Sequence, residues 1–137
     1  MKVLMTPPPE DPGEYIENSV RTWRVLNGSG FPFDEEAVRK RAALAYERCY
    51  HPQGTARQLA AILASPSREE KLSSLKIPTL VIHGGDDPLV PVEYGRETSE
   101  VIPESKLLII EGMGHCLPEG AWPRIIEAIA KKAAKLR

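Results

Sequence analysis

Two neighbouring aspartates and one histidine are of the residue types that general acid–base chemistry uses. Asp86 and Asp87 follow an apolar segment directly, in the stretch LVIHGGDDPLVP of residues 80–91. His115 lies in the glycine-rich stretch EGMGHCLPEG of residues 111–120. An imidazole that acts as a general base needs an acceptor for its Nδ1–H, usually a carboxylate, which fixes the tautomer and stabilises the imidazolium. An aspartate held beside His115 would meet that need.

Short apolar segments before these positions predict two strands of a parallel sheet. Residues 79–83 and 106–110 are β-branched and apolar on both faces, as in strands that are covered on both sides. Helices are predicted after them, at about 92–101 and 121–136, and a strand–helix–strand–helix order forms a right-handed unit with parallel strands. The inner side of the last helix is predicted to carry Trp122, Ile125, Ile126 and Ile129. Both carboxyl ends then open on one edge of the sheet, where α/β proteins gather their chemistry.

The sequence before Pro78 predicts helices and no strand. Helices are predicted over residues 14–27, 35–49, 56–64 and 68–74. The first is ended by NGSG at 27–30, and Asp34 is a good N-cap for the second. Capping boxes are predicted to open the last two, at Thr55–Gln58 and Ser67–Glu70. The expected divisions of the chain are an extended proline-rich arm, a helical segment and a βαβα part, at residues 1–13, 14–76 and 77–137.

Composition is that of an ordinary globular protein and argues against several classes of partner. The chain has 137 residues, 42% of them hydrophobic and 27% charged, and a formal net charge of −1. A nucleic-acid surface or a polybasic membrane patch is therefore not expected. No apolar run reaches the roughly 20 residues that span a bilayer, and the N-terminal stretch has no signal-peptide pattern. We expect a cytoplasmic protein with no membrane span.

No metal or nucleotide cofactor is expected from the sequence. The three histidines are scattered, and no glycine-rich phosphate-binding loop follows a strand. Cys49 and Cys116 have neither the number of a disulfide framework nor the spacing of metal ligands, so both are expected to be reduced thiols.

Each candidate residue also has a purely structural interpretation. Gly-Asp-Asp-Pro is a turn-forming sequence, and a histidine in a glycine-rich loop need not be functional. His83 at the strand end is interpreted as structural, and His51 in YHPQG as a loop residue between helices. For Asp87 and His115 the functional interpretation is favoured, because both are predicted at matching ends of consecutive parallel strands.

The stretch IPTLVIHGGDDPLVPVEYGRETSEVIPESKLLIIEGMGHCLPEGAWPRIIEAI, residues 77–129, resembles the C-terminal part of an α/β-hydrolase-fold protein of the esterase and lipase-like branch. The family pattern is a strand, HGxxDxxVP with the triad acid, a helix, a second strand, and GxGH with the triad histidine. Matched position by position, the resemblance implies that Asp87 is the acid and His115 the base. Asp86 is then the neighbour of the acid and not its match.

The rest of the chain resembles the helical cap of the same branch, with residues 51–80 as its end and 14–49 as its earlier helices. The resemblance implies a partial α/β-hydrolase fold and a carboxylic-ester hydrolase. The family's nucleophile elbow, GxSxG, and the oxyanion-hole segment before it do not occur in the sequence. The nearest string, NGSGF with Ser29, is interpreted as a helix stop. The group that His115 would activate is left open between a serine elsewhere, Cys116 and water, and at most weak or partner-dependent hydrolysis is expected.

Two other functions stay open beside the hydrolase. The chain would be a catalytically inactive, truncated hydrolase that binds small apolar ligands or acts as an interaction module, or a separate chain would complement it with the missing strands and the elbow. Two strands alone make a poor sheet with exposed apolar edges. We therefore expect a homo-oligomer, as a dimer, or a complementing chain, and a small apolar ester as substrate or ligand.

Overall fold

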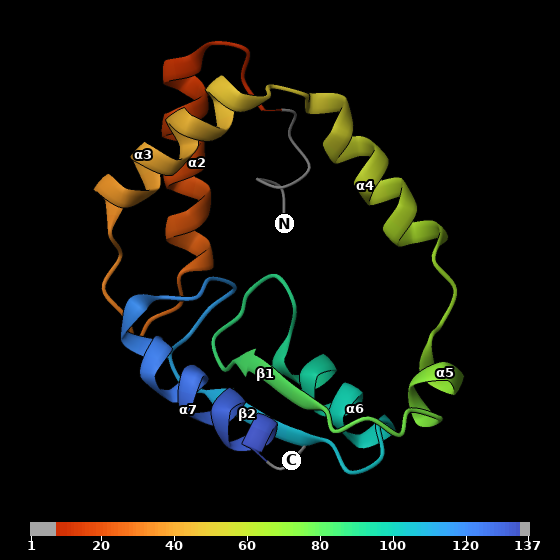
Figure 1. Cartoon of the computed structure of the whole chain (residues 1–137). Helices are drawn as coiled ribbons and strands as arrows, with labels where there is room; N and C mark the ends of the chain where they lie inside the picture. Colours follow the sequence, from red (N-terminus) through yellow and green to blue (C-terminus); the bar gives the residue numbers. More distant parts are fainter. Residues whose placement is uncertain (1–7, 135–137) are drawn as a thin grey trace. The chain divides into compact units, whose positions relative to one another are not determined.

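The computed structural model describes residues 8–134, which form two compact units (Figure 1). The described residues divide into 8–25 with 34–66 for the first unit, and 26–33 with 67–134 for the second. The segment 26–33, which contains the helix stop predicted at 27–30, thus belongs to the unit that contains the strands. Residues 1–7 of the predicted arm lie outside the described part. Within residues 8–134, no helix is long and apolar enough to cross a bilayer.

Three helices make up nearly all of the first unit: α2 (Pro12–Leu26), α3 (Glu35–Arg48) and α4 (Pro52–Ala64). The first two have nearly the predicted bounds. Asp34 accepts a hydrogen bond from the Ala37 N–H at 2.9 Å, which confirms the predicted N-cap of α3. Arg39 of α3 bonds both Glu17 of α2 and Glu35 of its own helix, so charge pairs join the two helices.

Helix α4 begins earlier than the sequence pattern predicts. The predicted start at residue 56 was wrong, because Pro52 occupies the first helical turn, where its fixed φ suits a helix and its missing N–H costs nothing. The capping box at Thr55–Gln58 therefore does not open the helix. The Gly54 N–H donates to the His51 carbonyl at 2.9 Å, which closes the first turn instead. No residue of α4 is fully buried.

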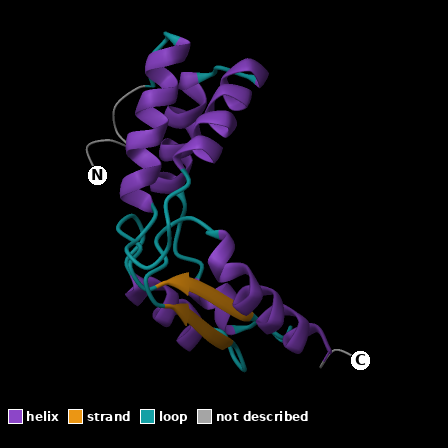
Figure 2. Cartoon of the chain, turned by 90° about the vertical axis from the view of Figure 1, so that its left-hand side faces the viewer, coloured by secondary structure: helices purple, strands orange, loops and turns teal. Residues whose placement is uncertain are grey.

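The second unit contains the predicted strand–helix–strand–helix unit. Strands β1 (Leu80–Gly84) and β2 (Lys106–Ile110) pair in parallel, in register from Leu80 opposite Lys106 to Gly84 opposite Ile110. The crossover is α6 (Val92–Val101), and α7 (Trp122–Ala133) follows a short 3₁₀ turn, η1 (Glu119–Ala121). Helix α6 packs on both strands and α7 packs on β1, and Figure 2 shows the two helices on either side of the sheet. The prediction of parallel strands is confirmed.

The short helix α5 (Glu69–Ser73) precedes the sheet and packs against α6. Ser67 Oγ accepts a hydrogen bond from the Glu69 N–H at 3.3 Å, one residue earlier than a capping box requires. The predicted capping box was therefore wrong, since the N-cap residue of α5 is Arg68 and its side chain forms no cap hydrogen bond.

The core of the second unit is small and lies at the carboxyl ends of the strands. Ile110, Met113 and Ala121 are buried there, and Phe31, Ile82, Leu108 and Ile125 pack against them. The predicted inner side of α7 was wrong for three residues, which are 47%, 62% and 51% exposed: Trp122, Ile126 and Ile129. A sheet of two strands is too narrow to cover that whole helix face. The last residues predicted for this helix, 135 and 136, lie outside the described part.

Candidate active site

Asp87 lies in the turn that follows β1, and the turn is built around its carboxylate. Oδ1 accepts hydrogen bonds from the Leu89 N–H at 2.8 Å and the Val90 N–H at 2.9 Å. The side chain is only 5% exposed. The turn is tied to the segment after β2 by the Asp86 N–H, which donates to the Met113 carbonyl at 2.9 Å. The glycine- and acid-rich turn therefore fixes one carboxylate in place, which is more than a chain reversal needs.

His115 lies beside this carboxylate, in the loop after β2. Its Nδ1 is 2.7 Å from Asp87 Oδ2, and its side chain is 38% exposed. Because a carboxylate only accepts, Nδ1 carries the hydrogen, and the neutral ring has its free lone pair on Nε2. The two residues that the sequence pattern singles out are thus brought together at the carboxyl ends of adjacent strands, where Figure 2 shows the loops gathered.

The environment keeps Asp87 ionised. Burial acts to raise the pKa of this carboxyl, but the hydrogen bonds from the Val90 N–H, from His115 and from the Leu89 N–H outweigh burial and hold the pKa below its ordinary value. An ionised carboxylate in this position is able to stabilise an imidazolium.

His83, interpreted from the sequence as structural, supports the Asp87 turn. Its Nε2 is 2.9 Å from the Val90 carbonyl and 3.9 Å from Asp87 Oδ2, and its side chain is 14% exposed. The ring lies against Gly95 of α6, where an added Cβ would come within 2.6 Å of His83 Nδ1. His83 therefore links the strand, the turn and the crossover helix.

The segment 26–30 also holds the His115 loop, a contact that the sequence analysis missed. The His115 N–H donates to the Leu26 carbonyl at 2.7 Å, and the Gly30 N–H donates to the Gly112 carbonyl at 2.9 Å. The two backbones approach so closely that a Cβ at either Gly28 or Gly112, both at positive φ, would collide with the facing backbone. The available signal was the pair of matching glycine patterns, NGSG and GMG, in segments far apart in the chain.

The two other candidate nucleophiles, Ser29 and Cys116, form hydrogen bonds with Asp86 and Asn27. Ser29 donates from both its N–H and its Oγ to Asp86 Oδ2. Cys116 Sγ is 3.3 Å from Asn27 Oδ1 and 3.7 Å from the Asn27 carbonyl oxygen. Asp86 therefore tethers a loop, whereas Asp87 orients the histidine.

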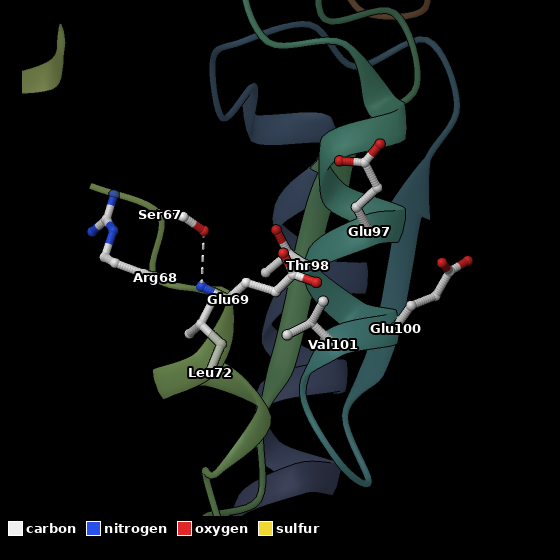
Figure 3. A pocket seen from close by; sticks show the side chains of 8 residues that line it. All are labelled: Ser67, Arg68, Glu69, Leu72, Glu97, Thr98, Glu100 and Val101. Carbon is white, nitrogen blue, oxygen red and sulfur yellow. Dashed lines mark hydrogen bonds between the residues drawn. The ribbon is translucent and has the colours of Figure 1, made fainter. Parts of the chain in front are cut away.

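A separate surface depression lies between α5 and α6 (Figure 3). Its eight lining residues include neither Asp87 nor His115. The carboxylates of Glu97 and Glu100 point away from its centre in Figure 3. Within residues 8–134, no cluster of three or more His, Cys, Asp and Glu side chains is arranged to hold a metal ion.

The geometry agrees with what the chain matches among known proteins. The family model of the α/β hydrolase fold matches residues 22–120. The chain belongs to the α/β-hydrolase-fold family. The matched range contains both strands, the Asp87 turn and the His115 loop, so the predicted family and its partial α/β fold are confirmed.

Relatives of this α/β-hydrolase-fold chain include esterases. The rhodomycin D methylesterase DnrP of Streptomyces peucetius is 34% identical over 129 residues, which are 94% of this chain and 43% of that protein. Two solved structures are each 26% identical. The esterase RhEst1 from Rhodococcus has a TM-score of 0.68 over 94% of this chain and 45% of its own. A bromoperoxidase from Bacillus anthracis has a TM-score of 0.70 over 87% of this chain and 44% of its own. The chain thus spans less than half the length of the proteins it matches.

Proposed function

We propose that this chain supplies the acid and the base of a carboxylic-ester hydrolase. The observation that carries the proposal is the 2.7 Å contact between His115 Nδ1 and a buried Asp87 carboxylate that is fixed by two backbone N–H groups. His115 Nε2 takes the proton of the attacking hydroxyl and later returns it to the leaving alcohol. Asp87 keeps the ring in the required tautomer and stabilises the imidazolium.

In this proposal the nucleophile and the oxyanion donors come from outside these 137 residues. The sequence has no GxSxG, and Ser29 and Cys116 form hydrogen bonds with Asp86 and Asn27. With water as the only nucleophile, His115 would still act as a general base, but slowly, because no oxyanion donors assist it. The chain alone is therefore expected to hydrolyse only activated esters, and weakly.

We propose a small apolar ester as the substrate class. The first unit carries exposed apolar side chains that could bind apolar groups: on α4, Leu59, Ile62 and Leu63 are 36%, 60% and 77% exposed. The relative DnrP is named a methylesterase, which supports ester chemistry without specifying the alcohol or the acid here.

We also propose that the chain self-associates as a homodimer. The exposed stripe of Trp122, Ile126 and Ile129 on α7, beside a sheet of two strands, is the kind of apolar surface that soluble monomers rarely leave uncovered. Light scattering after size exclusion should give twice the chain mass at micromolar concentration. A strict monomer there would refute the dimer, and a larger assembly would refute this pairing in favour of non-specific association.

The test of the hydrolase is the release of p-nitrophenol from p-nitrophenyl acetate and butyrate. His115→Ala and Asp87→Asn should each return the rate to that of buffer, since removing a general base costs roughly 10²–10⁴-fold in complete sites. His51→Ala is the matched control, because His51 is an exposed histidine at the start of α4 and should keep the wild-type rate. Equal rates in all four proteins would show non-specific attack by surface groups and would refute the proposal.

A further inference from the structure

Asn27 is a buried polar residue that the proposed chemistry does not yet use. It is 7% exposed and lies in the segment directly after α2, beside the His115 loop. Its side chain makes a contact in each direction. Nδ2 donates to the Phe31 carbonyl at 2.8 Å, and Oδ1 lies 3.3 Å from Cys116 Sγ. A buried side chain with both its donor and its acceptor in use is costly to replace, because either partner is then left unsatisfied.

The contacts of Leu26 and Asn27 reach three consecutive residues around the base. The Gly114 N–H donates to the Asn27 carbonyl at 3.0 Å, and the His115 N–H donates to the Leu26 carbonyl at 2.7 Å. The Cys116 thiol then contacts both oxygens of Asn27. The histidine therefore lies in a backbone segment that is held before it, at it and after it.

Among these contacts, only that of the Cys116 thiol with Asn27 Oδ1 depends on the identity of the side chain at position 27. The carbonyl contacts are open to any residue that takes this backbone conformation. Only an amide side chain can donate to the Phe31 carbonyl in its own segment and at the same time accept from the Cys116 thiol in the His115 loop. Leucine, of similar size, can do neither, and aspartate can only accept.

We propose that Asn27 is a positioning residue that acts through Cys116 to hold His115 against Asp87. The proposal rests on the proposed function for the role of His115 as base, but the geometry it concerns exists whether or not an ester is hydrolysed. Displacing a catalytic imidazole by about 1 Å can lower the reaction rate roughly a hundredfold. A contact at the adjacent residue can therefore affect the rate.

The closing experiment compares Cys116→Ala with Cys116→Ser in the full chain. The readout is the ¹H–¹⁵N signal of the His115 Nδ1–H, which reports its hydrogen bond to Asp87 directly. Serine keeps a donor for Asn27 Oδ1 and should keep the signal. Alanine removes the donor and should broaden or shift the signal, while the backbone amide signals of β1 and β2 stay in place. A signal unchanged in Cys116→Ala would overturn the proposal.

Two variants at position 27 test the other partner of the contact. Asn27→Leu should weaken the same signal more than Cys116→Ala does, and it should lower kcat for p-nitrophenyl butyrate by roughly tenfold or more with little change in KM. Asn18→Leu on α2 is the matched control and should change neither, since Asn18 accepts a hydrogen bond from Thr22 Oγ1 through its backbone carbonyl. If Asn27→Leu fails to fold, the alanine and serine pair at Cys116 still decides.

The proposal and the proposed function fail in different ways. A weakened Nδ1–H signal without any ester hydrolysis in any variant supports the positioning role and refutes hydrolysis by this chain alone. Hydrolysis that depends on His115 but is equal in wild type, Asn27→Leu and Cys116→Ala supports the hydrolase and overturns the positioning role.

Discussion

Replacing Asp87 tests whether the turn after β1 is built around a carboxylate. Three donors converge on this side chain, the N–H groups of Leu89 and Val90 and the Nδ1–H of His115. In Asp87→Ala all three lose their acceptor. Each half-buried backbone donor left unsatisfied costs about 1 kcal/mol, and the charged bond to His115 contributes a further 1 kcal/mol or so. The expected loss in the free energy of unfolding of the second unit is therefore about 3 kcal/mol.

Asp87→Asn separates the shape of the side chain from its charge. The amide oxygen keeps the two backbone bonds but turns charged acceptors into neutral ones, so the expected loss is about half as large, roughly 1.5 kcal/mol. The amide nitrogen then faces His115 Nδ1 as a donor, and the ring is driven to the tautomer with hydrogen on Nε2. That tautomer removes the lone pair that a general base needs.

The assay is urea denaturation followed through the amide signals of β1 and β2, with the ring ¹⁵N shifts of His115 read in the same samples. Asp34→Asn is the matched control, since asparagine caps a helix about as well as aspartate and the substitution should be nearly neutral. If Asp87→Asn and Asp87→Ala both stay within about 0.5 kcal/mol of wild type, the turn is not held by this carboxylate and the reasoning is refuted.

The pH dependence of the free energy of unfolding tests the same contact, and the lowered pKa of Asp87 predicts its direction. The pKa of Asp87 is lowered in the folded chain from its ordinary 3.8, so its ionised form stabilises the fold. This contribution is complete above the ordinary pKa and is lost as pH falls through the lowered value. The difference in the free energy of unfolding between wild type and Asp87→Asn should therefore be constant at neutral pH and shrink below about pH 4. A difference that grows on acidification would contradict the lowered pKa.

The remaining predictions concern the residues around the pair. Gly95→Ala should destabilise the second unit by about 1–3 kcal/mol despite the better helix propensity of alanine, because the new Cβ meets the His83 ring; increased stability in urea denaturation would contradict that packing. Ser29→Ala should leave p-nitrophenyl butyrate hydrolysis at the wild-type rate, and a fall to the buffer rate would make Ser29 the nucleophile. Asp34→Ala should cost about 1 kcal/mol in the first unit, measured by thermal unfolding, and no loss would mean that the cap bond to Ala37 is not formed in solution.

Much of the fold could be predicted because local patterns decide it. Strands at β1 and β2 are short, apolar on both faces and bounded by turn residues, and Asp34 has the cap geometry that its type favours. The predictions failed where a residue or element outside the pattern determined the helix start or the burial. The start of α4 follows Pro52 and not the capping pattern three residues later. The exposure of Trp122 follows from how few strands lie beside α7, which the helical period of that segment does not reveal.

Part of the site could be predicted from single segments, and part depends on a contact between two distant segments. Asp87 and His115 follow consecutive strands, so a parallel pairing brings them together without any further information. The segment 26–30 is over eighty residues from the His115 loop, and its role depends on two glycine-rich backbones meeting. Neither glycine pattern identifies the other as its partner, since each alone predicts only a turn or a helix end.

The Asp87–His115 pair is therefore a property of the sheet edge and its loops, not of a complete catalytic centre. The Leu89 and Val90 N–H groups and the His115 ring hold the Asp87 carboxylate, and backbone contacts from Leu26, Asn27, Gly30 and Asp86 hold the His115 loop. None of these contacts needs a nucleophile elbow. A chain of this kind can thus keep a preorganised Asp–His pair whatever becomes of the group it would activate, and activity should return when a suitably placed hydroxyl and oxyanion donors are supplied.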